Sequence, residues 1–345
     1  MKILLAGNYH HFFYEEVCAR EMERLGHEVI RFAYRDFYRG FWGKLEQHFI
    51  FPGPQTRRLN RHLIRVALEH RPDVVIVWRG THILRSALVT IKRYLHTCLV
   101  SYVNDDPFGP QYQSGNWHQR RLWHLFRKTI PVFDQNYVFR ATNLQEYKAA
   151  GAQHADLFLP YYIPELFENI EKPALPEHDV AFIGHYEPHR LECIRYLLAN
   201  GVQVKLYGTG WDAAALNLSR DAQPIAPIHG SGYYQSLLNA RIALGFLSKL
   251  NRDEYTRRSF EIPGCGALML CERTEAMQAL FEEGREAVYF SSKEELLEKT
   301  QMLLADEGLR QRIAAAGQAR CQKSGYDVRS RVKNWVDRIE AAKVP

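Results

Sequence analysis

The feature that most constrains the fold is a regular alternation of short apolar runs with amphipathic segments of helical length. In the first half, the sequence predicts strands at residues 2–6, 28–33, 74–78, 99–103 and 136–139. In the second half, it predicts strands at residues 180–183, 204–207, 242–247, 267–270 and 288–290. Strands separated by helical patterns indicate parallel sheets with helices on both faces. The predicted fold class is therefore α/β, with a doubly wound arrangement in each half.

A proline-rich stretch separates the two halves. Four prolines lie between residues 160 and 176. Proline fixes φ and lacks a backbone N–H, so it disfavours helices and central strands. A chain of 345 residues also exceeds the usual size of one hydrophobic core. We predict an N-terminal domain over residues 1–165, a C-terminal domain over residues 166–327 and a helical tail over residues 328–345.

The composition predicts a cytoplasmic protein without a metal site. No apolar run approaches the roughly 20 residues that span a bilayer. The apolar start, Met1 to Gly7, is too short for a secretion signal. Six cysteines are scattered without a CxxC motif or the Cys and His spacing of a zinc site, which is typical of reduced thiols.

Net charge and the first loop narrow the class of ligand. A net charge of +6 suits an anionic ligand or an anionic membrane surface better than a nucleic acid. The first predicted strand is followed by Gly7-Asn8-Tyr9-His10 rather than by G-x-G-x-x-G. Because that fingerprint marks the dinucleotide site of Rossmann dehydrogenases, the sequence argues against such a cofactor.

Arg258 and Glu261 form the sharpest candidate site. They are three residues apart on a predicted helix, so they share one face. A guanidinium can hold a diphosphate, and a carboxylate beside it can hold a ribose diol. The alternative interpretation is an exposed helix carboxylate paired with Arg257 or Arg258.

Other candidates in the second half follow predicted strands. Glycine directly after a strand lets a ligand approach the backbone, and a following helix N-terminus favours phosphate. A basic loop after the strand at 242–247 supplies a second cation for a diphosphate, although a solvated loop is the alternative. The candidate residues for binding a nucleoside diphosphate group, called the donor-binding residues below, are Gly184, His185, Arg190, Tyr207, Gly208, Lys249, Arg258 and Glu261.

In the first half, the candidate catalytic residues are Asp105, Asp106 and His11. Both aspartates follow a predicted strand and precede a proline. Adjacent carboxylates repel, which raises one pKa and suits proton transfer from a hydroxyl group. The alternative is a turn or a helix cap that uses Asp as an acceptor. His11 lies in the loop after the first strand, where a structural or solvated role is its alternative.

The segment around Arg258 resembles the donor-binding segment of GT-B glycosyltransferases. The matching residues are Arg258-Ser-Phe260-Glu261, Gly266-Ala267, the strand 268–271 and Gly284-Arg285-Glu286. The likeness is greatest to the "glycosyl transferases group 1" subset that includes the CgeB-like spore-maturation proteins, and it covers roughly residues 179–331. It implies two Rossmann-like domains facing a cleft, with the C-terminal helix crossing back to the first domain. It also implies an Asp-rich segment at the place of Asp105 and Asp106.

The resemblance implies a metal-independent glycosyltransferase that moves a sugar from a nucleotide-sugar, its substrate rather than a cofactor, to a hydroxyl acceptor. The second domain would hold the donor and the first domain the acceptor, a glycan, a lipid-linked molecule or a small molecule. Seven residues separate Asp253 from Glu261, which is the spacing of the glutamate pair of many retaining enzymes with a shorter first side chain. That departure leaves the stereochemical outcome open.

Three other functions remain as alternatives. One is a nucleotide-sugar epimerase or hydrolase on the same fold, and another is a non-catalytic binding or coat-assembly protein that keeps the donor pocket. The third treats Asp105 and Asp106 as the metal-binding pair of a GT-A enzyme, but the two-domain pattern and the Arg258 motif argue against it.

Two stretches, residues 31–65 and 117–128, mix basic and aromatic residues. Such stretches fit weak peripheral contact with the inner face of a membrane, or a lipid-linked or phosphorylated acceptor. The alternative is a solvated helix face with a few core anchors.

Overall fold

The computed structural model describes residues 1–110, 112, 117–212, 216, 225–249 and 251–342, which form two compact units. Unit 1 contains Met1–Leu159, residues 251–252 and residues 328–342. Unit 2 contains Pro160–Lys249 and Asp253–Asp327. Residue 250 of the predicted basic loop and residues 343–345 of the predicted tail lie outside the described residues.

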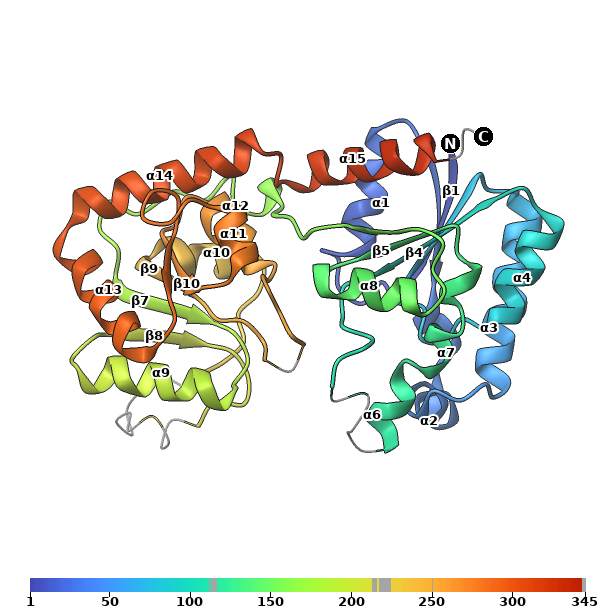
Figure 1. Cartoon of the computed structure of the whole chain (residues 1–345), viewed down its shortest axis with the longest axis horizontal. Helices are drawn as coiled ribbons and strands as arrows, with labels where there is room; N and C mark the ends of the chain where they lie inside the picture. Colours follow the sequence, from blue (N-terminus) through green and yellow to red (C-terminus); the bar gives the residue numbers. More distant parts are fainter. Residues whose placement is uncertain (111, 113–116, 213–215, 217–224, 250, 343–345) are drawn as a thin grey trace. The chain divides into compact units, whose positions relative to one another are not determined.

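In the described part of unit 1, six parallel strands form one sheet in the order β2-β1-β3-β4-β5-β6 (Figure 1). The strands are β1 (Lys2–Gly7), β2 (Glu28–Ala33), β3 (Val74–Trp78), β4 (Cys98–Val103), β5 (Gln135–Val138) and β6 (Ala155–Leu157). In register, Leu4 of β1 lies between Ile30 and Val75. Strands β1, β3 and β4 are almost wholly buried, because helices cover parallel sheets on both faces.

Amphipathic helices supply the rest of this core. Buried side chains of α3 recur at Thr56, Leu59, Leu63 and Ala67, which is the spacing of one helix face. Pro54 stands at its first turn, where the missing N–H costs nothing. The described helices of unit 1 are α1 (Glu15–Arg24), η1 (Tyr34–Phe37), α2 (Gly40–Phe49), α3 (Pro54–His70), α4 (Arg85–Tyr94), α6 (Trp117–Leu122), α7 (His124–Arg127), η2 (Ile130–Val132), α8 (Ala141–Ala149) and α15 (Val328–Ala341).

The C-terminal helix α15 is part of unit 1 and packs against α1. Its Trp335 is fully buried, with ring centroids 4.3 Å from Phe158, 5.8 Å from Tyr102 and 6.3 Å from Trp78. These rings belong to the strands β3 and β4 and to the residue after β6. The helix therefore completes an aromatic layer of the first sheet.

In the described part of unit 2, five parallel strands form a second sheet in the order β11-β10-β9-β7-β8. The strands are β7 (His178–Ile183), β8 (Val204–Tyr207), β9 (Ala240–Gly245), β10 (Met269–Glu272) and β11 (Val288–Phe290). Counted along the chain within each unit, the first five strands of both sheets have the order 2-1-3-4-5. That order belongs to doubly wound folds, whose switch point lies between strands 1 and 3. The predicted pair of Rossmann-like α/β domains is confirmed.

Several of the helices of unit 2 begin with a side-chain cap. Thr274, Ser292 and Asp306 each accept a hydrogen bond from a backbone N–H in the first turn that follows. The helices are η3 (Pro164–Leu166), α9 (Pro188–Ala199), α10 (Ser231–Leu238), α11 (Arg258–Gly264), α12 (Glu275–Leu280), α13 (Lys293–Ala305) and α14 (Glu307–Lys323). None of the helices in the described ranges is both long and apolar enough to cross a membrane.

Each strand predicted from the sequence is present, and in six cases an end is shifted by one or two residues. The run predicted at 242–247 is β9 at Ala240–Gly245, and the run predicted at 267–270 is β10 at Met269–Glu272. The short edge strand β6 was not predicted. Its sequence, Ala-Asp-Leu, contains a charged residue and does not stand out as an apolar run, unlike the equally short β11.

Candidate functional site

The candidate donor residues of unit 2 gather at the switch point of its sheet. Gly184 directly follows β7, and Lys249 lies four residues after β9, which is the neighbour of β7. In open α/β sheets, ligands bind outside the carboxyl ends of the strands at this point. The fold therefore brings Gly184 and Lys249 to the place where a ligand is expected.

The turns after β7 and β8 contact each other through their glycines. The Gly184 N–H donates to the Tyr207 carbonyl at 2.9 Å, and the Trp211 indole donates to the Gly184 carbonyl at 2.8 Å. A Cβ atom on Gly208 would lie 1.9 Å from that same carbonyl oxygen, and its φ is +145°. Only glycine fits at 208, so this residue has a structural reason as well as its predicted role.

His185 and Arg190 fix the Gly184 turn. The exposed His185 ring is hydrogen-bonded to the Thr209 hydroxyl through Nδ1. Arg190 is 3% exposed, donates to the His185 carbonyl at 2.9 Å and pairs with Glu187 at 2.6 Å. Burial lowers the pKa of Arg190, and the positive charge of nearby Arg258 lowers it further. Glu187 raises this pKa, but by less, so the net shift is downward. Arg190 therefore supports the turn, and its charge is already partly neutralised.

Arg258 differs from Arg190 in lacking a counter-ion. Its guanidinium carbon lies 6.0 Å from the centre of the buried Phe182 ring, and that of Arg190 lies 5.9 Å from the same ring. Phe182 in turn lies directly beneath Gly184. Within the described residues, no carboxylate lies within 4.0 Å of Arg258, and its Nε is buried without a hydrogen-bond partner. A buried donor without a partner is rare in proteins and points to an acceptor supplied by a ligand.

Lys249 is held at the same edge by acidic residues that the sequence analysis missed. Its Nζ lies 2.9 Å from Glu272, and its N–H donates to Glu187 at 3.3 Å. The Lys249 side chain is 60% exposed. His189 lies 3.8 Å from Glu187 and 3.9 Å from Glu272, and burial lowers its pKa. The one signal in the sequence that could have identified Glu272 is its position directly after the apolar run in β10.

Glu261 is buried rather than exposed. It lies in the first turn of α11 and is 2% exposed. Its oxygens accept hydrogen bonds from Tyr233 at 2.9 Å and Tyr234 at 3.2 Å, and Arg257 lies 2.8 Å away. The alternative of an exposed carboxylate is therefore wrong, and its ion-pair partner is Arg257. The ribose contact stays a prediction.

In unit 1, Asp105 is held by a residue from the neighbouring strand end. Asp105 follows β4, and its Oδ2 lies 2.7 Å from Nε of Arg79, which follows β3. Arg79 has a φ of +50°, and its N–H donates to the Tyr102 carbonyl at 2.8 Å. The Asp105 side chain is 27% exposed, so it is oriented by Arg79 and still reaches solvent.

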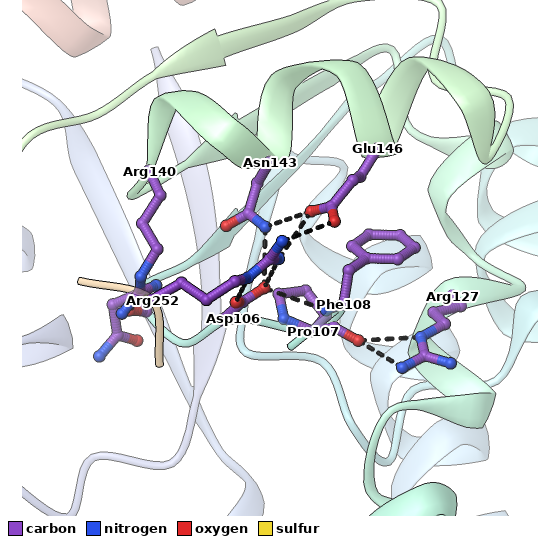
Figure 2. A network of polar contacts seen from close by, with 9 residues as sticks. Asp106, Pro107, Phe108, Arg127, Arg140, Asn143, Glu146 and Arg252 are labelled. Atoms are coloured by element: carbon purple, nitrogen blue, oxygen red, sulfur yellow. Dashed lines mark hydrogen bonds and ion pairs between the residues drawn. The ribbon is translucent and has the colours of Figure 1, made fainter. Parts of the chain in front are cut away.

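Asp106 lies in a buried network, which Figure 2 shows. It is 0% exposed, and its two oxygens accept from Arg252 at 2.6 and 2.8 Å and from Asn143 at 2.8 Å. The same guanidinium donates to Glu146 at 3.0 Å, and the Phe108 N–H donates to Asp106 at 3.1 Å. Burial raises the pKa of Asp106, but Arg252 and Asn143 outweigh it and hold the pKa below its usual range. The raised pKa expected from carboxylate repulsion is therefore wrong for Asp106.

The loop after β1 contains His11 and ends at a carboxylate that the sequence analysis missed. His11 is exposed, and its ring stacks on Phe13 with centroids 5.0 Å apart. Glu15 is 4% exposed and accepts from the Asn8 N–H at 2.8 Å, and burial raises the pKa of Glu15.

Another histidine of unit 1, His82, lies in the loop after β3. It is buried against the Gln47 carbonyl, and burial lowers its pKa to about 4. His82 is therefore a neutral structural side chain.

No group of three or more His, Cys, Asp or Glu in the described ranges is placed to hold a metal ion. The cations at the unit 2 site are Arg258, Arg190 and Lys249. Their side-chain charge can receive an anion, and the Gly184 and Gly208 turns leave room for a ligand to approach the backbone.

Comparison with known proteins supports the fold and part of the sequence. A model of the family described as glycosyl transferase-like matches residues 190–337, which is less than half of the chain. No curated protein matches.

Solved structures match along nearly the whole chain. HepE of Anabaena in complex with UDP-glucose has a TM-score of 0.68 at 14% identity, covering 99% of this chain and 100% of HepE. Sucrose-phosphate synthase of Thermosynechococcus elongatus has a TM-score of 0.69 at 10% identity, with 99% and 100% covered. A putative UDP-N-acetylglucosamine 2-epimerase of Listeria monocytogenes has a TM-score of 0.59 at 14% identity, with 99% and 96% covered. At these identities the likeness shows the fold, which is the GT-B type.

Proposed function

We propose that the protein is a glycosyltransferase that moves a sugar from a nucleotide-sugar to a hydroxyl acceptor. The observation that carries this proposal is Arg258, a partly buried guanidinium beside the Gly184 turn with no carboxylate partner in the described residues. A diphosphate supplies the acceptor oxygens and the negative charge that this position lacks. The glycosyl transferase-like match over residues 190–337, which contains Arg258, supports the same function.

The donor contacts follow from the arrangement in unit 2. Arg258 binds the diphosphate, and Lys249 joins it by exchanging Glu272 for phosphate. Arg190 keeps the Gly184 turn in place, and Glu261 holds the ribose together with its tyrosine partners. These cations stabilise the departing diphosphate as negative charge develops on it, so the proposed reaction needs no metal ion. UDP-glucose is the first donor to test, because HepE was crystallised with it.

The acceptor contacts are proposed in unit 1. In an inverting reaction, Asp105 takes the proton of the acceptor hydroxyl while its oxygen attacks the anomeric carbon and the bond to the diphosphate breaks. Asp106 is a positioning residue there, because four donors occupy its oxygens. The exposed His11 is proposed to contact the acceptor, which is a glycan, a lipid-linked molecule or a small molecule.

The finer family and the location are also proposals. The motif from Arg258 to Glu286 supports the CgeB-like subset of the GT-B enzymes. The six cysteines all lie in the described ranges and none is in a disulfide bond, as is typical of proteins in a reducing compartment, which supports a cytoplasmic location.

Release of UDP from UDP-glucose should require an acceptor. The measurement is a coupled UDP assay in buffer containing EDTA, with and without a panel of monosaccharide, polyisoprenyl phosphate and small phenolic acceptors. Turnover that disappears in EDTA and returns with Mg²⁺ or Mn²⁺ would show that the metal-independent mechanism is wrong.

The second candidate is a nucleotide-sugar epimerase, which the likeness to the Listeria protein favours. The same assay separates the candidates. A changed sugar on intact UDP-sugar, without acceptor, identifies an epimerase, and UDP release without acceptor identifies a hydrolase. Donor binding without turnover across the whole panel leaves a binding protein.

Replacing Arg258 with alanine should weaken UDP binding by about 1.5–3 kcal/mol, which is the range of hydrogen bonds to charged groups. Uridine should bind as before, because it lacks the diphosphate that Arg258 recognises. Isothermal calorimetry with both ligands measures the two effects.

Arg285→Ala is the matched control, because Arg285 is a 70% exposed arginine of the same unit. That variant should bind UDP like the wild type. If Arg258→Ala weakens uridine and UDP binding equally, Arg258 has a structural role and the proposed diphosphate contact is wrong.

A further inference from the structure

Two helices of unit 1 that are distant in sequence, α2 and α6, lie side by side. Figure 1 shows them together at the lower edge of that unit. The rings of Phe49 in α2 and Trp117 in α6 have centroids 5.8 Å apart. The fold thus joins parts of the two basic and aromatic stretches into one surface.

This surface exposes aromatic rings that ordinary packing would bury. Trp42 is 75% exposed, Phe41 is 72% exposed and Trp117 is 52% exposed. Phe41 and Trp42 contact each other edge to face, with centroids 5.4 Å apart. Scattered exposed apolar residues are normal, but two contacting exposed rings with a third on the neighbouring helix mark an interaction site. We call these three rings the aromatic tip: Phe41 and Trp42 at the start of α2, and Trp117 of α6 beside the last residue of α2.

Positive charge surrounds the aromatic tip. Arg39, Lys44 and Arg120 are exposed there, and the Arg121 guanidinium lies 4.8 Å from the centre of the Trp117 ring. Two acidic residues are near in sequence. Asp36 pairs with Arg39 at 3.6 Å.

The other acidic residue, Glu46, does not reach the surface. It is the one acid of α2, it is 3% exposed, and its carboxylate accepts from the backbone N–H groups of Gln55 and Thr56. The exposed face of α2 therefore carries aromatic and positive side chains without a negative one.

Other basic and aromatic residues of the two stretches have ion-pair partners or lie in the core. Arg31 is bound by Glu16 at 2.9 Å and Glu23 at 2.6 Å. Trp123 and Phe126 are 0% exposed and belong to the core. The solvated-face alternative therefore describes part of these stretches, and the aromatic tip is the part that it does not explain.

We propose that the aromatic tip seats unit 1 on an anionic lipid surface. Tryptophan and phenylalanine rings insert at the level of the headgroups, and lysine and arginine beside them bind lipid phosphates. An anionic lipid surface also complements the charge of α2, whose exposed face has positive side chains and no acidic one. This inference goes beyond the proposed function and does not depend on it.

The test is sedimentation of the full chain with vesicles at low salt. The wild type should bind vesicles that contain phosphatidylglycerol, bind pure phosphatidylcholine more weakly, and leave the anionic vesicles when ionic strength rises. The double variant Phe41→Ala/Trp42→Ala should reduce binding by about tenfold or more. These side chains are exposed, so the variant should fold like the wild type.

The control is Val89→Ala/Tyr94→Ala, a pair of exposed apolar residues on α4 of the same unit. It should bind anionic vesicles like the wild type. Wild-type protein that stays in the supernatant at low salt, or a Phe41→Ala/Trp42→Ala variant that binds fully, overturns the proposal. Self-association that depends on Trp42, without vesicle binding, overturns it in favour of a protein interface.

Discussion

Replacing Asp105 with asparagine should reduce turnover by about 100-fold or more, because a positioned general base contributes on that order. Donor binding should be unchanged, since Asp105 belongs to unit 1 and the proposed donor residues belong to unit 2. The asparagine amide keeps the shape of the side chain and its place beside Arg79, but it does not accept a proton.

The measurements are initial rates with the identified acceptor and calorimetry with UDP. Asp36→Asn is the control, because Asp36 is a 58% exposed aspartate of the same unit. Full turnover of Asp105→Asn would show that the loop after β4 is a turn without a catalytic base. Loss of UDP binding together with turnover would show a general structural defect.

Replacing Arg252 with alanine should lower the free energy of unfolding by about 3 kcal/mol. The variant leaves Asp106 as a fully buried carboxylate without its counter-ion, and that penalty is the main cost of breaking a buried ion pair. We expect the lower end of the usual range, because the Arg252 side chain is 28% exposed. Urea unfolding measures the change in the free energy of unfolding. Hydrogen exchange of residues 98–110 shows whether the effect lies in unit 1.

Arg273→Ala is a closely matched control. Arg273 also bridges two carboxylates, Glu283 and Glu295, and its side chain is 27% exposed, but both partners reach solvent. Its loss should cost at most about 1 kcal/mol. Adding Asp106→Asn to Arg252→Ala should recover part of the lost stability by removing the buried charge. Additive losses in the double variant would show that the two residues do not act as a pair.

The effect of Arg252 should depend on pH. The pKa of Asp106 is lower in the folded state than in the unfolded chain. Its stabilisation is therefore complete above the unfolded pKa of about 4 and is lost as pH falls through the lower folded value. The difference in stability between wild type and Arg252→Ala should shrink in that acidic range and stay constant above it.

The fold was readable from the sequence because parallel strands are buried on both faces. Runs such as Val74–Trp78 and Val288–Phe290 are apolar enough to stand out between amphipathic segments, and their bounds agree with β3 and β11. The start of β10 was predicted two residues too early because Ala267 and Leu268, which precede the strand, are as buried as the strand itself. Strand order was not predicted, since it depends on contacts between distant segments.

The site was only partly readable for the same reason. Glycine after a strand and a cation at a strand exit are local signals, so Gly184 and Lys249 were found. Ion pairing is not local. Arg252 lies 146 residues from Asp106, and no pattern near either residue indicates that they meet or that their contact lowers the Asp106 pKa. The sequence alone also could not show that Arg258 lacks a carboxylate partner among the described residues, because this depends on every residue that lies near it in the fold.

The return of α15 to unit 1 has a consequence for the newly made protein. The first sheet is translated early, yet its aromatic layer waits for Trp335 and its buried Asp106 waits for Arg252. Both come from parts of the chain that leave the ribosome much later. Every residue of unit 2 precedes Val328 in the chain. The N-terminal half is thus synthesised first and matures last, and until then its unfinished surface is exposed to chaperones and proteases.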